Sequence, residues 1–523
     1  MIIVRHLLPF VVIVFPVLLL HCSEVNRPES EKPISADPFK DIPDSLPPIA
    51  ESDHYPPPHM TVGNGSALSC TMEALELAVD SLYRAKQGGT IRFSSGNEPA
   101  VIAIRRPLLV HAPDTPLVID GGNLITFDGR NTGRIISCSN YTRLILKNIK
   151  MINGGCDSSG GALLHPWFGT LECYGVTFTG NRCTVRGPEF GGGAVFAGGL
   201  DRCIFHRCVF TDNQASNGGA ILNRGANLII DSCTFEKNIA TGDGGGKDAG
   251  ASGQGGLGGA VYIDGMNYDA ALPFQLHASA FTGNVSHCHG SAVFSYYYKN
   301  KPGTSGASVF ACSFSDNRDS GSTTSAGTLY HEGGPLKLHA CAFANNITLS
   351  HAGALFLGPD AASEIVNCTF YGNLTRGNGG AIFGGNQRIA IWNCTFYGNT
   401  ASYGPALFND NPDAVAVYNT LFVENIPIIN QHAFRNCTGT YTTGAQVFQW
   451  PRNKANGAPD NPCIAGARFA DPLLDALADN GGPTHTMALH DGSPAIDVCD
   501  SCPPVDQRGM PRSRPCDAGA YER

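Results

Sequence analysis

Apolar and polar positions recur along this chain in short runs with a nearly constant spacing. A C-x-F-x-x-N element begins at residues 208, 233, 312, 341, 368 and 394. Weaker copies place phenylalanine and asparagine at 178/181, 281/284 and 422/425, and successive phenylalanines from 314 to 422 lie 29, 27, 26 and 26 residues apart. A period between about 20 and 50 residues indicates a solenoid, a propeller or another repeat array.

The parity of the apolar positions within one repeat predicts how the chain folds there. Residues two apart share a face of a strand. Ile389 and Ile391 therefore share one face, and Cys394 and Phe396 share one, but Ile391 and Cys394 are three residues apart. Both pairs can face a single core only if the chain bends at residues 392–393.

A third apolar segment, glycine-glycine-alanine followed by an apolar and an aromatic residue, lies elsewhere in each repeat, with Gly219, Gly259 and Gly380 as examples of its second glycine. Each repeat then holds three short strands and returns to its starting edge. The asparagine after each C-x-F strand suits a corner, because asparagine tolerates the left-handed backbone conformation. A propeller blade needs roughly 40 residues or more, and the leucine spacing of leucine-rich repeats is missing. The pattern predicts an all-β fold, a three-sided parallel β-helix.

The cysteines of the repeat form one column in this arrangement. Cys312, Cys341, Cys368 and Cys394 are expected inside, as small residues that stack easily. A redox or metal-binding column is the alternative. We favour the filler, because positions in register on adjacent coils are unhelpful for disulfide geometry.

Both ends of the array differ from its middle. Residues 68–86 predict an amphipathic helix that caps the first coil, with an apolar face of Met72, Leu75, Leu77, Val79 and Leu82. Residues 431–523 lose the period and are rich in proline, aspartate and cysteine. We therefore expect a β-helix over 61–430 and an irregular C-terminal cap over 431–523.

The start of the chain has the features of an export signal. Arg5 and His6 precede an apolar run from Leu7 to Leu20, which is too short for a comfortable membrane span. Residues 1–22 are therefore read as a signal peptide, and Cys22 as a lipidation site of lipoprotein type. His21 fits that motif poorly, so cleavage without lipidation and a retained anchor stay open. Residues 23–60 are polar and proline-rich, as expected of a tether.

Charge and composition exclude some partners. The formal net charge is −9 over 523 residues, with no block of lysine and arginine, which disfavours nucleic acid and anionic membrane. We expect membrane contact only through the lipid anchor. The 19 cysteines include no pair of CxxC motifs, so a structural metal site is not expected, and no cofactor is predicted. We expect a monomer.

An aromatic column follows the third strand of each repeat. It has the opposite parity to the branched aliphatic residue just before it, so only one of the two columns faces the core. If the aliphatic column does, the aromatic residues form an exposed ladder that suits glycan rings or a partner protein. The alternative places the aromatic rings in the core. We favour exposure, which makes the candidate binding residues Phe196, Tyr262, Phe294, Tyr330, Phe356, Phe383 and Phe408.

Longer stretches resemble known families. The segments "GGTIRF", "IDGGNLITFDG" and "GGAILNRGANLIIDSCTFEKN" resemble bacterial right-handed parallel β-helix proteins of the pectin-lyase-like superfamily, including chlamydial polymorphic outer membrane protein repeats. The tail motifs NGGPT, GSPAID, DQRG and CDAGAYE resemble the choice-of-anchor Q domain. The resemblance implies a right-handed helix in a cell-surface, outer-membrane or secreted protein. It also implies a disulfide between Cys502 and Cys516, with Cys499 as the second choice for Cys516, and we expect a second bridge between Cys437 and Cys463.

Catalysis is the alternative to binding, because the superfamily includes polysaccharide lyases and hydrolases. The hydrolase motifs N-T-D, D-D, G-H-G and R-I-K do not occur in the sequence, and no catalytic residue is assigned. His287 and His289 lack a third ligand at a fixed spacing, so we predict no metal site there. We expect an adhesion or polysaccharide- or partner-binding protein of the cell surface. A polysaccharide lyase or glycoside hydrolase, and a passive surface rod, are the alternatives.

Overall fold

The computed structural model describes residues 55–85, 87–244, 255–265, 274–297, 306–321, 326–429 and 433–523. The chain divides into two compact units, residues 1–38 and 39–523. The first unit lies outside the described residues, as do the predicted signal peptide, Cys22 and most of the proline-rich segment, so these stay predictions. All described residues belong to the second unit. No helix among its described residues has the length and apolar character that a membrane span needs.

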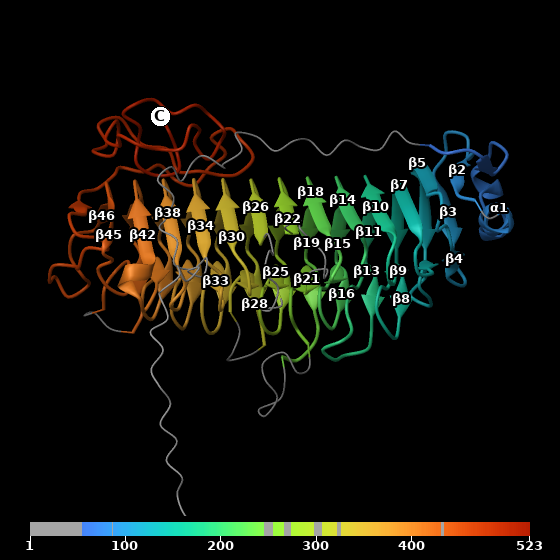
Figure 1. Cartoon of the computed structure of the whole chain (residues 1–523), viewed down its shortest axis with the longest axis horizontal. Coiled ribbons are helices and arrows are strands. Elements are labelled where there is room, and N and C mark those ends of the chain that lie inside the picture. Colours follow the sequence, from blue (N-terminus) through green and yellow to red (C-terminus); the bar gives the residue numbers. More distant parts are fainter. Residues whose placement is uncertain are drawn as a thin grey trace, which may run out of the picture. The chain divides into compact units, whose positions relative to one another are not determined.

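Three sheets, whose strands all pair in parallel, form the walls of a β-helix (Figure 1). The strand from each coil pairs with the equivalent strand of the next coil, as in the register Ile389↔Val415 and Phe396↔Phe422. The predicted fold class is confirmed. Each coil has four strand segments instead of the three predicted. Two of the predicted strands lie in the same sheet, and the third wall is formed by a short strand that the sequence pattern did not indicate.

We name the walls sheets A, B and C. Sheet C, the unpredicted wall, consists of strands of two residues that follow the repeat asparagine: β8 (Gly155–Cys156), β12 (Arg182–Cys183), β16 (Gln214–Ala215), β20 (Ile239–Ala240), β24 (Val285–Ser286), β28 (Arg318–Asp319), β32 (Ile347–Thr348), β36 (Leu374–Thr375), β40 (Thr400–Ala401) and β44 (Ile426–Pro427). Sheet B contains the glycine-glycine-alanine segments: β4 (Leu108–Val110), β6 (Ile136–Cys138), β9 (Leu163–His165), β13 (Val195–Gly198), β17 (Ile221–Arg224), β21 (Val261–Asp264), β25 (Val293–Tyr296), β29 (Leu329–Glu332), β33 (Leu355–Leu357), β37 (Ile382–Phe383) and β41 (Leu407–Phe408).

Sheet A unites the other two predicted strands of each repeat. Its first rank contains β1 (His59–Val62), β2 (Gly89–Phe93), β10 (Thr170–Tyr174), β14 (Arg202–His206), β18 (Leu228–Asp231), β22 (Phe274–His277), β26 (Ala307–Phe310), β30 (Leu336–His339), β34 (Ser363–Val366), β38 (Ile389–Trp392), β42 (Val415–Tyr418) and β45 (Thr443–Ala445). Its second rank contains β3 (Ala100–Ala103), β11 (Thr177–Thr179), β15 (Val209–Thr211), β19 (Thr234–Glu236), β23 (Ala280–Thr282), β27 (Ser313–Ser315), β31 (Ala342–Ala344), β35 (Thr369–Tyr371), β39 (Thr395–Tyr397), β43 (Leu421–Val423), β46 (Phe448–Trp450) and β47 (Arg468–Phe469). Two long strands, β5 (Leu117–Asp128) and β7 (Arg143–Ile152), run through both ranks.

The predicted bend lies between the two ranks. Asn393 separates β38 from β39 and has a φ of 48°, in the left-handed region. This single residue restores the inward direction after a three-residue step, so Ile391 and Cys394 are both fully buried in the same core. The equivalent residues of other coils have the same backbone conformation: Arg207, Ser232, Ala278, Ala311, Ala340, Asn367 and Asn419.

The repeat asparagines are placed differently from the prediction. They do not take the left-handed conformation. The residue before each of them does, as at Asp316 (φ 56°) and Gly398 (φ 65°). Each asparagine instead points inward and is fully buried. Asn399 shows the reason, because its side-chain nitrogen donates to Oδ1 of Asn425 (3.0 Å) and to the carbonyl of Phe370 (2.9 Å). A column of identical amides can satisfy itself inside the core.

Stacked rings and thiols occupy the interior beside the aliphatic side chains of the strands. The phenylalanines of the repeat stack in parallel along the axis, with centroids 4.5 Å apart for Phe314 and Phe343. The cysteine column is buried as expected, and its sulfurs also take part in hydrogen bonds. The Sγ of Cys394 accepts the backbone N–H of Cys368 at 3.4 Å. These sulfurs therefore serve backbone groups at the bend as well as filling space.

The N-terminal end is capped by a helix, as predicted. A 3-10 turn, η2 (Ala67–Ser69), precedes α1 (Met72–Arg84), which packs against β1, β2 and β4. The hydroxyl of Thr71 accepts the N–H of Ala74 and caps the helix start. Leu77 is a correction: it is 69% exposed, because a residue two positions after Leu75 lies on the opposite side of a helix.

The C-terminal region begins by continuing the array, since β45–β47 extend sheet A. A second 3-10 turn, η3 (Pro412–Ala414), precedes β42 in the coil before them. The chain then folds back over the outer face of sheet A (Figure 1, red). Ala520 donates its N–H to Thr395, Thr484 donates to the carbonyl of Ala340, and Asn367 donates to the carbonyl of Val505. We call residues 471–523 the C-terminal segment.

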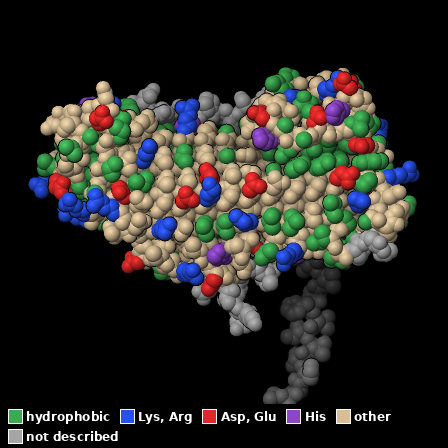
Figure 2. All heavy atoms as spheres, turned by 180° about the vertical axis from the view of Figure 1, so that it is seen from behind, with side chains coloured by type: hydrophobic (Ala, Val, Ile, Leu, Met, Phe, Trp, Pro, Cys, Tyr) green, Lys and Arg blue, Asp and Glu red, His purple; other side chains and the backbone are tan. Residues whose placement is uncertain are grey.

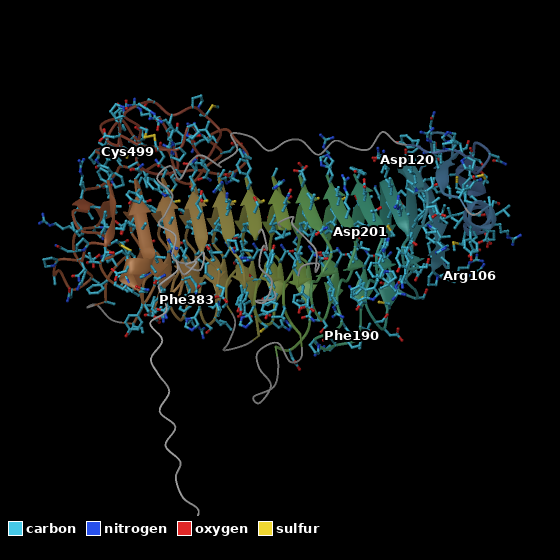
Figure 3. All side chains as sticks on the ribbon, viewed as in Figure 1. Arg106, Asp120, Phe190, Asp201, Phe383 and Cys499 are labelled. Atoms are coloured by element: carbon cyan, nitrogen blue, oxygen red, sulfur yellow. A yellow bond between two sulfur atoms is a disulfide. The ribbon has the colours of Figure 1, made fainter. Side chains whose placement is uncertain are left out.

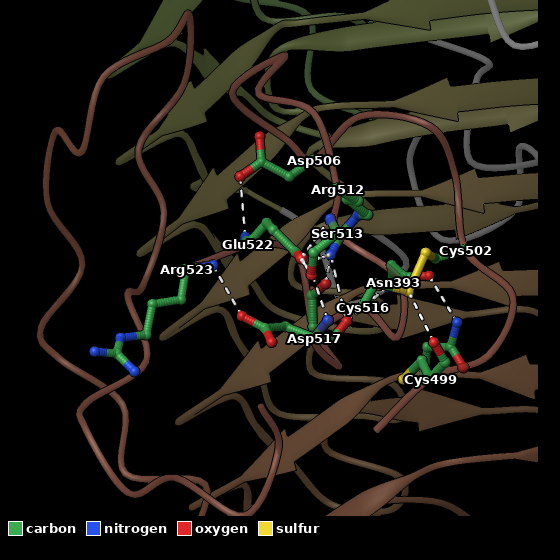
Figure 4. A network of polar contacts seen from close by, with 12 residues as sticks. Asn393, Cys499, Cys502, Asp506, Arg512, Ser513, Cys516, Asp517, Glu522 and Arg523 are labelled. Atoms are coloured by element: carbon green, nitrogen blue, oxygen red, sulfur yellow. Dashed lines mark hydrogen bonds and ion pairs between the residues drawn. A yellow bond between two sulfur atoms is a disulfide. The ribbon is translucent and has the colours of Figure 1, made fainter. Parts of the chain in front are cut away.

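Two disulfides hold this region. Cys437 is bonded to Cys463, and Cys502 is bonded to Cys516, which are the pairs expected from the sequence. Cys499, the second choice for Cys516, is a buried free thiol, although its backbone pairs with that of Cys516. Figure 4 shows the polar network beside the second bridge, in which the buried guanidinium of Arg512 contacts Glu522 at 2.9 Å.

Candidate functional site

The aromatic column predicted as a binding surface lies on sheet B. The branched aliphatic residues before the rings, such as Val261 and Leu329, are inside the main core, so the rings point outward. The strand register aligns them from coil to coil, for example Phe294↔Tyr330 and Tyr330↔Phe356. Figure 3 places Phe383 on the side of the coils away from the C-terminal segment. The rings thus point away from the core, as in the favoured alternative, in which the aliphatic column faces the core.

The predicted exposure of most of these rings is wrong. Tyr262, Phe294 and Tyr330 are only 7–8% exposed, and Phe196 and Phe408 are 9% exposed. The cause is mutual stacking, because the centroids of Phe294 and Tyr330 lie 4.8 Å apart in nearly parallel planes. Stacking buries the ring faces against one another, so only the ring edges are accessible to solvent. Phe356 and Phe383 are the two predicted residues that remain partly exposed.

Neighbouring residues cover this stack further. Leu222 occupies the equivalent position on β17, between Phe196 and Tyr262, and completes the column. Leu222 is aliphatic and therefore lies outside the predicted set of aromatic residues. His289 stacks on Tyr330 with centroids 4.9 Å apart, and burial lowers the pKa of His289 to about 4. The column is thus a second apolar cluster outside sheet B.

A different surface presents aromatic rings beside carboxylates. On the outer face of the second rank of sheet A, the register aligns Tyr371, Tyr397, Val423 and Trp450. The rings of Tyr371 and Tyr397 are parallel, with centroids 5.6 Å apart. Both tyrosines and Trp450 are half-buried. These rings keep accessible surface that the sheet B column has lost.

These residues border a cleft of about 460 Å³, which we call the sheet A cleft. It lies between the last coils and the beginning of the C-terminal segment, and it is lined by Tyr397, Val423, Glu424, Trp450, Asp471, Leu473, Leu474, His490 and Asp491. Figure 2, seen from behind the view of Figure 1, shows a band of hydrophobic side chains directly below the C-terminal segment. This cleft was not predictable from the sequence, because its two walls are separated along the chain and have no common motif.

The electrostatics of the sheet A cleft are acidic. Burial raises the pKa of Tyr397, and the nearby charges of Glu424 and Asp471 raise it further. His490 contacts Asp475 at 2.6 Å, and Arg523 forms an ion pair with Asp491. Glu424 and Asp471 therefore give the centre of the cleft its negative charge. A polyanion would be repelled here, whereas carboxylate oxygens can accept hydrogen bonds from neutral hydroxyl groups.

One predictable feature marks where the C-terminal segment docks. The left-handed residue of the bend is asparagine in three successive coils, at Asn367, Asn393 and Asn419. Each side chain donates to a backbone carbonyl of the segment, namely that of Val505, Asp517 and Ser501. The five coils before these have arginine, serine or alanine at this position, and Asn148, at the equivalent position nearer the N-terminal end, donates to Asp120 instead. The local run of asparagines was therefore a readable signal for a docked segment.

One known protein family has a repeat that matches two segments of this chain. The model of the Chlamydia polymorphic membrane protein repeat matches residues 207–224 and 367–385. Both segments begin at the bend and end in sheet B, so the matched unit covers the second rank of sheet A, sheet C and part of sheet B. No curated protein matches the chain. The matches agree with the β-helix architecture and leave the ligand open.

Proposed function

We propose that this protein is exported and attached to the cell surface, where it binds a polysaccharide or a surface partner without catalysing a reaction. The match to the repeats of a membrane protein family supports the surface location. The two disulfides support it too, because such bonds persist in oxidising compartments. The choice-of-anchor Q identity of the C-terminal region and the lipid on Cys22 are parts of the same proposal.

The observation that carries the binding role is the sheet A cleft. Half-buried Tyr397 and Trp450 offer apolar ring surface, and Glu424 and Asp471 offer hydrogen-bond acceptors within the same hollow. Apolar platforms with a few well-placed polar groups are typical of small-molecule and sugar sites. The acidic lining favours a neutral or cationic glycan over a uronic acid polymer. The ladder residues Phe356 and Phe383 are a second contact surface for a partner, through their accessible edges.

A glycan-binding assay tests this role. The purified protein is run in native gels containing a neutral glucan, a xylan, chitosan or polygalacturonate, and its retardation gives an apparent Kd. We expect retardation by a neutral or cationic polymer, and at least tenfold weaker binding in Tyr397→Ala and Trp450→Ala, which corresponds to about 1.4 kcal/mol.

The matched control is Tyr403→Ala, because Tyr403 is an exposed tyrosine that does not line the sheet A cleft. This variant should bind like the unchanged protein. Equal loss in all three variants, or binding of polygalacturonate alone, would contradict the assignment to this cleft. Unsaturated products in the same samples would overturn the non-catalytic role in favour of a polysaccharide lyase, and shortened saturated products would do so in favour of a glycoside hydrolase.

A further inference from the structure

One pair of cysteines differs from the cysteine column of the core. Cys156 on β8 and Cys183 on β12 are register partners on adjacent strands of sheet C. Their sulfur atoms lie 3.0 Å apart. Neighbouring parallel strands are about 4.8 Å apart, within the Cα separation of roughly 4.4–6.8 Å that a disulfide requires. The backbone therefore already holds these two side chains at bonding distance, which corrects for this pair the expectation that positions in register on adjacent coils disfavour a disulfide.

The core column shows why this pair is special. Cys341 and Cys368 also lie on adjacent coils, but both are fully buried, and the Sγ of Cys368 accepts the backbone N–H of Cys341 and donates to the carbonyl of Val366. These sulfurs are engaged by the backbone and closed to reagents. Cys156, in contrast, is partly exposed, whereas Cys183 behind it is 4% exposed. The pair thus has one accessible and one shielded sulfur.

A fixed cation lies beside the accessible sulfur. The guanidinium of Arg134 donates to the carbonyl of Gly160 (2.9 Å), to the carbonyl of Ser159 (2.9 Å) and to the hydroxyl of Ser158 (2.8 Å). These bonds hold its charge against the loop that follows Cys156.

The two thiols consequently differ in acidity. The pKa of Cys156 is lowered to about 6, chiefly by the hydrogen bond from Cys183, and further by the backbone N–H of Ser158 and the charge of Arg134. The same hydrogen bond, together with burial, raises the pKa of Cys183. These shifts favour the thiolate on Cys156 and the thiol on Cys183, whose Sγ also contacts the carbonyl of Gly192 at 3.5 Å. A partly exposed thiolate next to a second thiol is the usual arrangement of a redox-reactive cysteine.

We propose that Cys156 and Cys183 form a thiol–disulfide exchange site that reacts with small-molecule or protein disulfides and closes a bond between adjacent coils. The thiolate of Cys156 attacks one sulfur of a disulfide R–S–S–R, forms a mixed disulfide and releases R–S⁻. Cys183 then passes its proton to the released R–S⁻ and attacks the sulfur of Cys156, which releases the second R–S⁻ to be protonated by solvent. The two protein thiols are oxidised, and one external disulfide is reduced to two thiols.

The test uses oxidised glutathione on the purified, fully folded protein after brief reduction with dithiothreitol. Remaining thiols are then alkylated, and disulfide-linked peptides are mapped by mass spectrometry. We expect a Cys156–Cys183 peptide in the oxidised sample and alkylation of both residues in the reduced sample. In Cys183→Ala, the mixed disulfide with glutathione should accumulate on Cys156, because the resolving thiol is missing. In Cys156→Ala, Cys183 should take up no glutathione.

The same peptide maps contain matched controls. Cys341 and Cys368 should stay unlinked despite their adjacent positions, and the buried Cys437–Cys463 and Cys502–Cys516 bridges should be present throughout. The proposal is overturned if Cys156 and Cys183 remain alkylated after oxidised glutathione, or if Cys183→Ala gives no adduct on Cys156. A bond that dithiothreitol cannot open in the folded protein would also overturn it, since this would be a permanent structural bridge. None of these outcomes depends on glycan binding.

Discussion

The side-chain amide of Asn373 donates a 2.9 Å hydrogen bond to Oδ1 of Asn399, its equivalent one coil later. Asn373 in turn accepts the backbone N–H and the side-chain amide of Asn346. In Asn373→Leu the buried backbone N–H of Asn346 loses its acceptor, and the side-chain amide of Asn346 keeps only its bond to the carbonyl of Phe314. Each buried donor left without an acceptor costs about 1–3 kcal/mol. We expect a clearly lower thermal midpoint, measured by circular dichroism. Thr234→Ala, at an exposed position of β19 in sheet A, should change the midpoint little, and an equal effect would contradict the role of the amide column.

At the bend between the two ranks of sheet A, replacing alanine by glycine should affect stability differently from the same change within a strand. Ala311 has a φ of 54°, whereas Ala307 is a regular residue of β26. Ala311→Gly removes a left-handed strain of about 1–2 kcal/mol, which exceeds the entropy cost of glycine, about 0.5–1 kcal/mol. It should therefore leave stability unchanged or raise it slightly, while Ala307→Gly should lower it by about 1 kcal/mol. Chemical denaturation of the two variants side by side checks the order, and a larger loss for Ala311→Gly would refute it.

The C-terminal segment depends on a buried ion pair. The side chain of Arg512 is 1% exposed and contacts Glu522 as well as the side chain of Asn367 on sheet A. Arg512→Ala leaves a buried carboxylate without its partner, which costs about 3–5 kcal/mol. We expect this segment to become sensitive to protease while the coils stay resistant, as read from the fragments in limited proteolysis. Arg514→Ala, at an exposed position two residues later, is the control and should be digested like the unchanged protein.

Buried histidines predict loss of stability in mild acid. Burial lowers the pKa of His331 to about 4, although its ring nitrogen Nε2 bonds to the carbonyl of Gly334 at 2.9 Å. An unfolded histidine has a pKa of about 6.5, so the unfolded chain binds the proton more readily. Stability is therefore complete above pH 6.5 or so and decreases toward pH 4, by about 3 kcal/mol for this one group.

Thermal midpoints measured from neutral pH down to about 4 test this dependence. His331→Gln should have a lower midpoint at neutral pH but a shallower decrease with acid, because its side chain cannot take up the proton. His165, whose pKa burial also lowers to about 4, should behave in the same way when replaced by glutamine. A decrease as steep in both variants as in the unchanged protein would assign the acid sensitivity to other groups.

The architecture could be predicted because successive side chains of a β-strand point strictly to alternate faces. The three-residue step from Ile391 to Cys394 allows one common core only with a bend, and the left-handed Asn393 supplies it. The helical cap followed in the same way from the spacing of Met72, Leu75, Val79 and Leu82, and only Leu77 was misplaced. Local periodicity was sufficient wherever one face of an element is buried.

Features that depend on contacts between coils were harder to predict. Asn399 looked like a surface corner, because a polar residue is costly in a core unless its partners are known. Those partners are asparagines about 26 residues away. The outward rings of sheet B were expected to be exposed, but parity gives the direction of a side chain and not what covers it. The sheet A cleft needed the fold of the C-terminal segment, which no periodic pattern describes.

The hydrogen bonds of the amide column all run in one direction. Each repeat asparagine from Asn181 to Asn399 donates a side-chain hydrogen bond to the repeat asparagine of the following coil. It ends where Asn425 donates to Asn436, whose own side-chain nitrogen has no acceptor among the described residues. Duplicating or deleting one whole coil would leave each remaining amide with a neighbour on either side. Loss of half a coil would interrupt the column of asparagine hydrogen bonds. The length of this molecule can therefore change over generations in complete turns while its two ends keep their own caps.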